Sequence, residues 1–439
     1  MAAIPNSCHT RPPMTARKTA ASKTVAPKAA APKSVAPKTA TRKTAKAADP
    51  LTTGLPLLGG MSPEQFMKRH WQKKPLLIRQ AVPGVKLPID RAALFELASK
   101  DDVESRLIIQ SPANAADGPK SRKKAAAGGW SMAQGPFARR ALPTLSQDQW
   151  TLLVQGLDLH VPAAHELITQ FRFVPEARLD DVMISYATNG GGVGPHFDSY
   201  DVFLLQVHGS RRWRIGRLKD DTLVPGVPLK ILQNFECEQE WVLEPGDMLY
   251  LPPRWAHDGI AQDECMTCSI GFRAPEASGL ASELLIRVAE GLDTDKRELY
   301  RDPGQVATTQ PGRMPAQLQA FAADAVAKIL RDPQQLQAAL GEVMTEPKPR
   351  VWFEQGEPLP DDCGANLAAA TRMLYDDKRV YVNGESWRAA GADMRLLQRL
   401  ADRRTLSAAE VSNASDEVRE LLDQFSEDGW LHATASSGF

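Results

Sequence analysis

Two histidines and one aspartate in the middle of the chain have the residue types and the spacing of a metal site. His196 and Asp198 are separated by one residue in the stretch Gly-Gly-Gly-Val-Gly-Pro-His-Phe-Asp. On a β-strand, side chains two residues apart point to the same face, so this imidazole and this carboxylate would meet at one spot. Together with His257 they would form a facial triad that leaves three coordination positions open, which is typical of non-haem Fe(II) oxygenases.

His257 ends a stretch that supports this hypothesis. The sequence Pro-Gly-Asp-Met-Leu-Tyr-Leu-Pro-Pro-Arg-Trp-Ala-His resembles the second motif of the cupins, in which a turn delivers a histidine to the mouth of a barrel. It departs from that motif at Arg254, where a glycine is usual. Small residues from Asn189 to Gly194 would let the backbone approach the site closely. The alternative stays open that the two histidines are packed side chains in a protein core.

The elements that must position these residues are short strands. From about residue 180 to residue 273, apolar runs of four to eight residues are separated by Gly, Pro and Asn. This texture, without helices in between, predicts an antiparallel sandwich or barrel. Strands are expected over residues 182–187, 202–207, 212–215, 241–243, 248–251 and 266–272.

Helices are predicted before this strand region. Ser62-Pro-Glu-Gln65 has the pattern of an N-cap, a proline at the first helical position and a capping-box glutamine. We therefore expect a helix through His70, and a second helix over about 90–99.

The region after residue 277 changes to helical periodicity. An apolar stripe recurs at helical spacing at Leu280, Leu284, Val288 and Leu292. A second helical pattern covers 318–340, with a possible break at Pro333. From about residue 350, helical patterns (392–403 and 414–428) mix with strand-like pieces (380–382 and 430–433). This mixture indicates a small α+β domain such as a winged helix.

Charge divides the chain into two parts. The whole sequence has 53 basic and 53 acidic residues, but residues 1–50 hold ten Lys or Arg and a single acidic residue, Asp49. This segment is rich in Ala, Lys and Pro and has hardly any large apolar residue, so we expect it to be disordered. It is either an electrostatic arm for RNA or ribosomes or a solubilising tail. A basic loop over 115–129, which includes Lys120 and Lys124, is either a flexible insertion or a nucleic-acid contact.

Composition excludes several classes of protein and site. No apolar run approaches the ~20 residues of a membrane span, and five cysteines are too few for a secreted disulfide framework, so we expect a cytoplasmic protein. Cys265-Met-Thr-Cys268 does not predict a metal site, because residues three apart on a strand point to opposite faces and no second pair completes four ligands. His208 is expected to be a packed or surface histidine. No glycine-rich phosphate loop stands between a strand and a helix.

Three stretches carry a resemblance to a known family. Residues 183–206, Arg211-Arg-Trp-Arg-Ile-Gly216 and Gly271-Phe-Arg-Ala-Pro275 resemble the JmjC-type ribosomal oxygenases of bacteria, whose best-known member hydroxylates an arginine of a large-subunit ribosomal protein. Trp71-Gln-Lys-Lys-Pro-Leu-Leu-Ile-Arg79 resembles the entry segment of this family. The resemblance covers roughly residues 55–275, and the C-terminal third more loosely. The basic tail and the loop near Lys120 have no counterpart in the family pattern.

The resemblance implies a cofactor and a cosubstrate. His196, Asp198 and His257 would bind Fe(II), and 2-oxoglutarate would occupy two of the three open positions. Oxidative decarboxylation of 2-oxoglutarate to succinate and CO₂ would then be coupled to the hydroxylation of an unactivated carbon.

The resemblance also implies residues that bind the cosubstrate. Arg211 matches the family's cation for the distal carboxylate of 2-oxoglutarate, and a guanidinium suits that task because it binds carboxylates in a fork. Ser185 matches a hydroxyl close to the cosubstrate. One alternative that stays open is that Arg211, Arg212 and Arg214 form a solvated basic face, within which Arg212 is expected at the surface because it alternates with Trp213 and Ile215. Another is that Ser185 is an incidental strand residue. Thr267 and Ser269 are weaker candidates.

The function implied by the resemblance is hydroxylation of an arginine side chain at Cβ in a large-subunit ribosomal protein. Outside residues 1–50 the chain has a net charge of about −9, which would suit a basic substrate by electrostatic steering. One alternative is a hydroxylase or demethylase of another residue, such as histidine. A second alternative is a non-catalytic cupin that binds ribosomes or RNA.

The expected fold class is therefore α+β, with a double-stranded β-helix (the cupin or JmjC jelly roll) as its main part. The expected organisation is a basic tail over 1–50, a catalytic domain over 51–275, a helical dimerisation region over 276–345 and a winged-helix-like domain over 346–439. A homodimer is expected because the family has such a helical element and because the stripe from Leu280 to Leu292 needs a partner. That partner is either the barrel or a second copy of the chain.

Overall fold

The computed structural model describes residues 49–111, 129–292 and 298–434. The basic tail lies outside the described residues except for its last two positions, and so does nearly all of the loop predicted over 115–129, including Lys120 and Lys124. The predictions about both segments therefore stay predictions. Within the described part of the chain, no helix is long and apolar enough to cross a bilayer.

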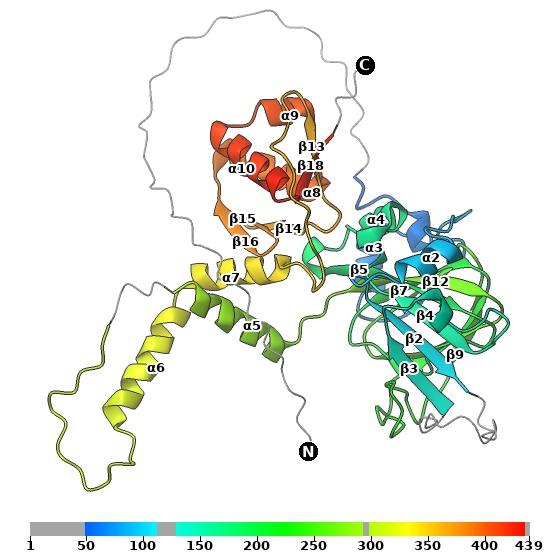
Figure 1. The fold of residues 1–439 in the computed structure, drawn as a ribbon, viewed down its shortest axis with the longest axis horizontal. Helices are drawn as coiled ribbons and strands as arrows, with labels where there is room; N and C mark the ends of the chain where they lie inside the picture. The colour runs from blue at the N-terminus through cyan, green and yellow to red at the C-terminus, as the bar shows by residue number, and fades with distance from the viewer. Residues whose placement is uncertain (1–48, 112–128, 293–297, 435–439) are drawn as a thin grey trace, which may run out of the picture. The chain divides into compact units, whose positions relative to one another are not determined.

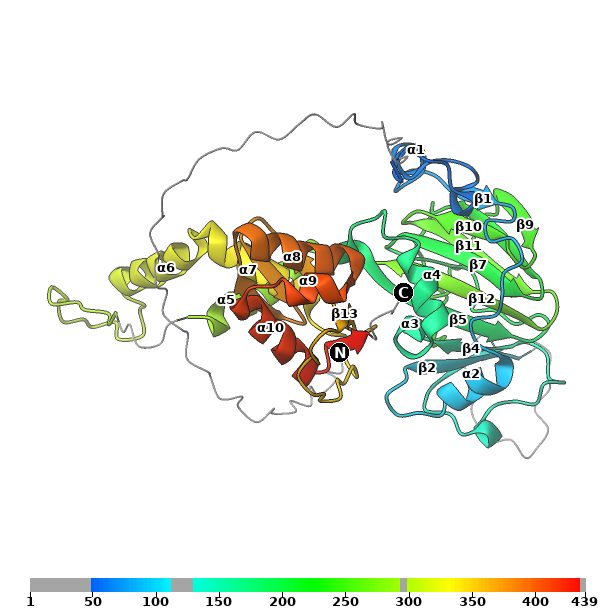
Figure 2. The same ribbon diagram turned by 90° about the horizontal axis from the view of Figure 1, so that it is seen from above.

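Eight strands form one antiparallel sheet in the order β1-β10-β7-β12-β5-β4-β2-β3 (Figure 1 and Figure 2). Their bounds are Leu76–Ile78 (β1), Ser105–Gln110 (β2), Trp130–Gln134 (β3), Trp150–Val154 (β4), Leu179–Ala187 (β5), Val202–His208 (β7), Met248–Leu251 (β10) and Cys265–Phe272 (β12).

Four strands form a second antiparallel sheet in the order β6-β11-β8-β9. Their bounds are His196–Phe197 (β6), Arg211–Arg217 (β8), Gln239–Leu243 (β9) and Trp255–Ala261 (β11). Side chains of both sheets share one apolar cluster, to which β7 and β10 contribute from the larger sheet and β8 and β9 from the smaller one. Two sheets packed face to face in this way confirm the predicted jelly roll.

Short helices cover the outer face of the larger sheet. They are α1 (Pro63–Arg69), α2 (Arg91–Leu97), α3 (Leu157–His160) and α4 (Pro162–Thr169), and Figure 2 shows α3 and α4 beside β5. Along β7, Phe203 and Leu205 join the cluster under these helices while Val202 and Leu204 join the cluster between the sheets. Because both faces are covered, β7 is apolar almost throughout. The capping box predicted at Ser62 is present.

Five strands of the two jelly-roll sheets, β1 to β4 and β11, were not predicted from the sequence. The larger sheet does not begin near residue 180 but includes β1 to β4, and the predicted turn before His257 leads directly into β11. All five residues of β4 are buried, so this strand has no polar and apolar alternation to reveal it. β1 has only three residues, which is too short for a periodic signal.

The chain after β12 is helical and then mixed, as predicted. The helices α5 (Ala277–Glu290), α6 (Ala316–Leu330) and α7 (Pro333–Thr345) come first, and Pro333 starts a new helix instead of continuing α6. α5 packs against α7 (Figure 1). The buried side of the stripe therefore has a partner within the same chain, which the sequence analysis did not consider. Val288 is its buried member in α5.

The last part of the described chain has its own apolar core. Its elements are β13 (Gly364–Leu367), β14 (Met373–Tyr375), β15 (Arg379–Val382), β16 (Glu385–Arg388), α8 (Gly391–Arg403), β17 (Thr405–Leu406), α9 (Ala408–Ser412), α10 (Asp416–Glu427) and β18 (Leu431–Thr434). The strands form two small three-stranded sheets. Helices and short strands in this arrangement agree with the predicted winged-helix-like domain. The residue boundaries predicted for the domains stay predictions.

Candidate metal centre

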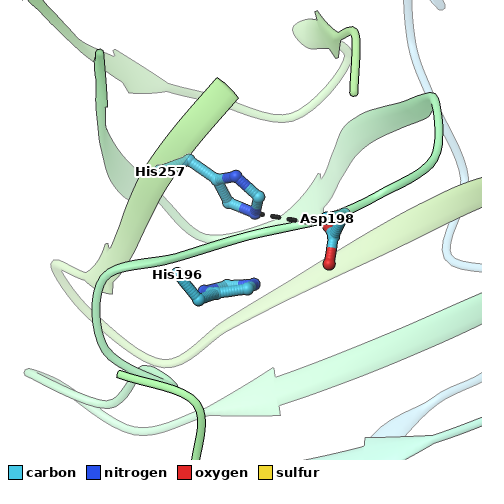
Figure 3. Close-up of side chains that lie close together, drawn as sticks. All are labelled: His196, Asp198 and His257. Atoms are coloured by element: carbon cyan, nitrogen blue, oxygen red, sulfur yellow. Dashed lines mark ion pairs between the residues drawn. The ribbon is translucent and has the colours of Figure 1, made fainter. Parts of the chain in front are cut away.

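Pairing between β6 and β11 brings the two histidines together. His196 and His257 are directly opposite each other in this pair, and their ring centres are 4.2 Å apart. Asp198 follows β6, and its Oδ2 lies 3.6 Å from Nε2 of His257 (Figure 3). One nitrogen or oxygen atom from each of the three residues lies within 4.8 Å of the others. The structure therefore unites the three side chains that the sequence analysis selected.

Each imidazole is oriented by a backbone carbonyl. Nδ1 of His196 is 2.9 Å from the Gly194 oxygen, and Nδ1 of His257 is 3.0 Å from the Trp255 oxygen. A proton on Nδ1 donates to that oxygen and leaves the lone pair of Nε2 free for a metal. Burial, with a further contribution from His196, lowers the pKa of His257 to about 4. His257 is thus neutral at physiological pH, as a metal ligand must be.

The turn before His257 explains why glycine is usual at the position of Arg254. Arg254 has a φ of +63°, a left-handed conformation that glycine adopts at no cost and other residues rarely adopt. Its backbone N–H donates to the backbone carbonyl oxygen of Asp198 at 2.8 Å. This bond connects the turn to the segment that carries the Asp198 carboxylate. The guanidinium carbon lies 5.7 Å from the ring centre of Phe197.

The donor set fits a divalent transition metal. Two imidazoles and one carboxylate on one side of a site match the facial triad of non-haem Fe(II) enzymes. Gly192 permits the close approach of the segment before His196, since a Cβ there would lie 2.6 Å from the oxygen of Gly259. Within the described ranges, no other three His, Cys, Asp or Glu side chains gather in this way.

Arg211 lies inside the jelly roll and not on a solvated face. It is 4% exposed, and its Nη1 donates to Oγ of Ser185 at 3.1 Å. Its Nε and Nη2 are buried and have no partner in the described structure. The side chain of Arg212 is 37% exposed, and its Nη1 lies 3.8 Å from Oε1 of Glu240. Inner and outer side chains therefore alternate along β8 as predicted, with Arg211 buried and Arg212 at the surface. Two buried N–H groups of Arg211 have no acceptor among the described residues.

Hydrogen bonds connect Ser185, the partner of Arg211, to polar residues of two further strands of the larger sheet, since Oγ of Ser185 donates to the backbone oxygen of Thr267 at 3.4 Å. Oγ1 of Thr267 on β12 donates to Oε1 of Gln206 on β7 at 2.8 Å, and Ser185 on β5 is opposite Thr267. Ser269 is only half buried. Gln206 was missed in the sequence analysis, although a single glutamine within an apolar strand is a recognisable signal of a polar interior.

The two cysteines of β12 do not form a site. Cys265 and Cys268 belong to different apolar clusters, and burial raises the pKa of the Cys268 thiol to about 12. Such a thiol is inert as a ligand or nucleophile at neutral pH. His208 is exposed at the end of β7, in agreement with its predicted surface role.

Two family descriptions match parts of the chain. Residues 166–280 match a JmjC domain, and residues 328–432 match a ROXA-like winged helix. Among curated proteins, ribosomal protein uL16 3-hydroxylase of Escherichia coli (strain K12) is 32% identical over 336 residues, which cover 73% of this chain and 84% of that protein. The probable ribosomal oxygenase of Haemophilus influenzae is 36% identical over 223 residues, which cover 50% of this chain and 52% of that protein.

Solved structures of E. coli YcfD are similar over most of their length. One has a TM-score of 0.70 at 27% sequence identity and covers 84% of this chain and 98% of that chain. A second, of YcfD in complex with cobalt and 2-oxoglutarate, has a TM-score of 0.65 at 28% identity and covers 85% of this chain and 98% of that chain. The similarity thus extends over the jelly roll and the elements that follow it.

Proposed function

Because this chain belongs to the JmjC-type ribosomal oxygenases, we propose that it hydroxylates an arginine side chain of a large-subunit ribosomal protein at Cβ. The reaction would use Fe(II) and 2-oxoglutarate. One observation carries the proposal: a facial triad and a buried arginine with two unpaired N–H groups share the interior of one jelly roll. Structures of the related YcfD hold cobalt and 2-oxoglutarate or succinate.

The triad would hold the metal through Nε2 of His196, Nε2 of His257 and a carboxylate oxygen of Asp198. An Fe(II) ion held there would supply the redox chemistry that couples decarboxylation of 2-oxoglutarate to oxidation of a C–H bond. The two backbone carbonyls behind the imidazoles fix the ring orientations, so both Nε2 atoms would be held ready to bind the ion. Arg211 would bind the distal carboxylate and so orient the cosubstrate.

The interior of the jelly roll would exclude water from the site. The apolar cluster between the sheets includes Leu204, Leu251 and Ile215. Only a few polar side chains stand among these residues, so a charged cosubstrate is bound in a poorly hydrated space. Electrostatic contacts are stronger there than in water. An arginine-rich ribosomal protein is a basic substrate and would be attracted by the net acidic charge outside residues 1–50.

Mass spectrometry tests this function. The full chain is incubated with Fe(II), 2-oxoglutarate, O₂ and unmodified ribosomal proteins, with a parallel incubation that lacks 2-oxoglutarate. We expect one arginine to gain the mass of one oxygen atom only when 2-oxoglutarate is present. Oxygen gained on a histidine, or loss of a methylene from a methylated residue, would instead support another JmjC activity. No mass change in any ribosomal protein would leave a non-catalytic binding protein as the better description.

We also propose that the chain acts in the cytoplasm as a homodimer formed through the helices that follow the jelly roll. Exposed apolar side chains in α5 support this, since Leu285 is 50% and Ile286 is 61% exposed. None of the residues of α6 is buried in the described structure, so this helix has an unpartnered face. For the tail over 1–50, we propose weak, salt-dependent contact with RNA or ribosomes, on the basis of its charge.

A further inference from the structure

Trp213 carries a buried hydrogen-bond donor with no acceptor. It lies on β8 two residues after Arg211 and is only 5% exposed. Its indole Nε1 has no hydrogen-bond partner among the described residues, as is also true of Nε and Nη2 of Arg211. Buried donors in folded proteins are nearly always paired. Three unpaired donors on the inner face of one strand therefore indicate that something else supplies the acceptor.

The pairing of β8 with β11 places Trp213 between the metal centre and Arg211. In this register Ile215 is opposite His257, and Trp213 is opposite Gly259. Arg211 is one further step along the same face of β8. Residues two apart on a strand are separated by roughly 6.8 Å. A small molecule held by the triad at one end and by Arg211 at the other would pass the indole.

The indole is oriented by its contact with Gly259. A Cβ at Gly259 would lie 2.6 Å from both Cη2 and Cζ3 of Trp213 and 3.0 Å from Cε3, so the six-membered ring packs directly on the backbone of β11. Nε1 belongs to the five-membered ring and is turned away from Gly259. The guanidinium carbon of Arg211 is 5.8 Å from the centre of the Trp213 ring, so the side chains that carry the three unpaired donors are neighbours.

We propose that Trp213 binds the distal carboxylate of 2-oxoglutarate together with Arg211, through its indole N–H. This inference rests on the proposed function and deepens it. A carboxylate accepts about four hydrogen bonds on its two oxygens, so it can receive Nε and Nη2 of Arg211 and Nε1 of Trp213 at the same time. The indole N–H can only donate. It would therefore help to orient the carboxylate, while Arg211 supplies the positive charge that attracts it.

The indole N–H resonance of Trp213 reports this bond directly. The full chain is labelled with ¹⁵N at its nine tryptophans and loaded with diamagnetic Zn(II). The Trp213 signal is assigned as the one missing from the Trp213→Phe variant. On addition of 2-oxoglutarate we expect this signal to move downfield, because an N–H that donates to a carboxylate is deshielded. 2-Oxobutyrate, which has the chelating keto acid but no distal carboxylate, should leave the signal in place.

A binding measurement provides an independent readout. Trp213→Phe keeps an aromatic ring but removes the N–H, so we expect the Kd for 2-oxoglutarate on the Mn(II)-loaded protein to rise roughly tenfold, as for one lost hydrogen bond to a charged group. The Kd for Mn(II) should not change. Trp241→Phe is the matched control, since Trp241 is opposite Trp213 on β9 and therefore one strand further from β11. This control should bind 2-oxoglutarate like the wild type.

The outcomes separate this inference from the proposed function. If wild-type protein binds 2-oxoglutarate but the Trp213 signal stays in place, or moves equally with 2-oxobutyrate, the inference is wrong and the function stands. An unchanged Kd in Trp213→Phe would contradict it in the same way and would indicate a role in packing only. If wild-type protein does not bind 2-oxoglutarate at all, both the function and the inference are wrong.

Discussion

Replacing Arg211 by alanine should weaken 2-oxoglutarate binding strongly and leave metal binding intact. The guanidinium is buried and already pairs with Ser185 through Nη1, so its two unpaired groups, Nε and Nη2, are the ones available to a ligand. Together these two groups would form one forked, charge-assisted pair with the carboxylate, and we take the loss of that pair as about 1.5–3 kcal/mol. At about 1.4 kcal/mol for each factor of ten, the Kd should rise about 10- to 150-fold.

Isothermal titration of the Mn(II)-loaded protein with 2-oxoglutarate measures this change, and a separate Mn(II) titration checks the metal centre. Arg211→Lys should fall between wild type and alanine, because it keeps the charge but loses the fork. Arg212→Ala is the matched control, because the Arg212 side chain is 37% exposed and faces Glu240. The Kd of this variant for 2-oxoglutarate should equal that of the wild type. Equal Kd values for Arg211→Ala and wild type, or a larger effect at Arg212, would refute the assignment.

Four further predictions follow from the structure and the sequence. His196→Ala should abolish succinate formation, because two remaining ligands do not hold Fe(II) in a facial geometry; turnover in an assay of 2-oxoglutarate consumption would contradict the triad. Burial, aided by a neighbouring carboxylate, raises the pKa of Asp158 from 3.8 to about 7, so the folded state favours the protonated form and loses stability as pH rises from about 4 to about 7. Asp158→Asn should remove that loss, which denaturant unfolding at pH 5 and pH 8 measures as a difference of about 3 kcal/mol, since about two pH units of the window lie above pH 5; parallel pH profiles of the two proteins would contradict it. Deleting residues 1–48 should leave the melting temperature unchanged and weaken ribosome association more at low than at high salt; a lower melting temperature, or association independent of the deletion, would refute the proposed tether. Light scattering should give the mass of two chains for the wild type and of one chain for a variant with Leu285→Asp and Ile286→Asp; a wild-type mass of one chain would refute the dimer.

The sequence alone was enough to select the three residues of the candidate metal centre. His196 and Asp198 are two positions apart, and neighbours at this spacing share a face of extended backbone, although the strand itself ends at Phe197 and Asp198 lies just beyond it. The capping box at Ser62 and the break at Pro333 depend likewise on a few adjacent residues, and the structure has both. Local geometry of this kind is written in local sequence, so it could be predicted.

The contacts that complete the site depend on strand pairing over long separations. The meeting of His257 with His196 depends on the register of β11 against β6. Alternation along β8 predicted Arg211 as inner and Arg212 as outer, but only the structure shows that Arg211 keeps two groups without a partner. Trp213 lies within the family-like stretch 211–216, but that stretch does not reveal its unpaired N–H, which is a property of its surroundings.

The tertiary structure also decided what the apolar surfaces cover. The stripe that includes Val288 satisfied the helical period, but the period does not specify the partner. In the structure α5 packs on α7, and the more exposed side chains are Leu285 and Ile286, which lie off that stripe. β4 was not predicted because all of its residues are buried. Burial on both faces removes the alternation of polar and apolar residues that marks a strand. Residue type and period are local properties of a chain, whereas register, burial and pairing arise only when distant segments meet, and these decided the form of the site.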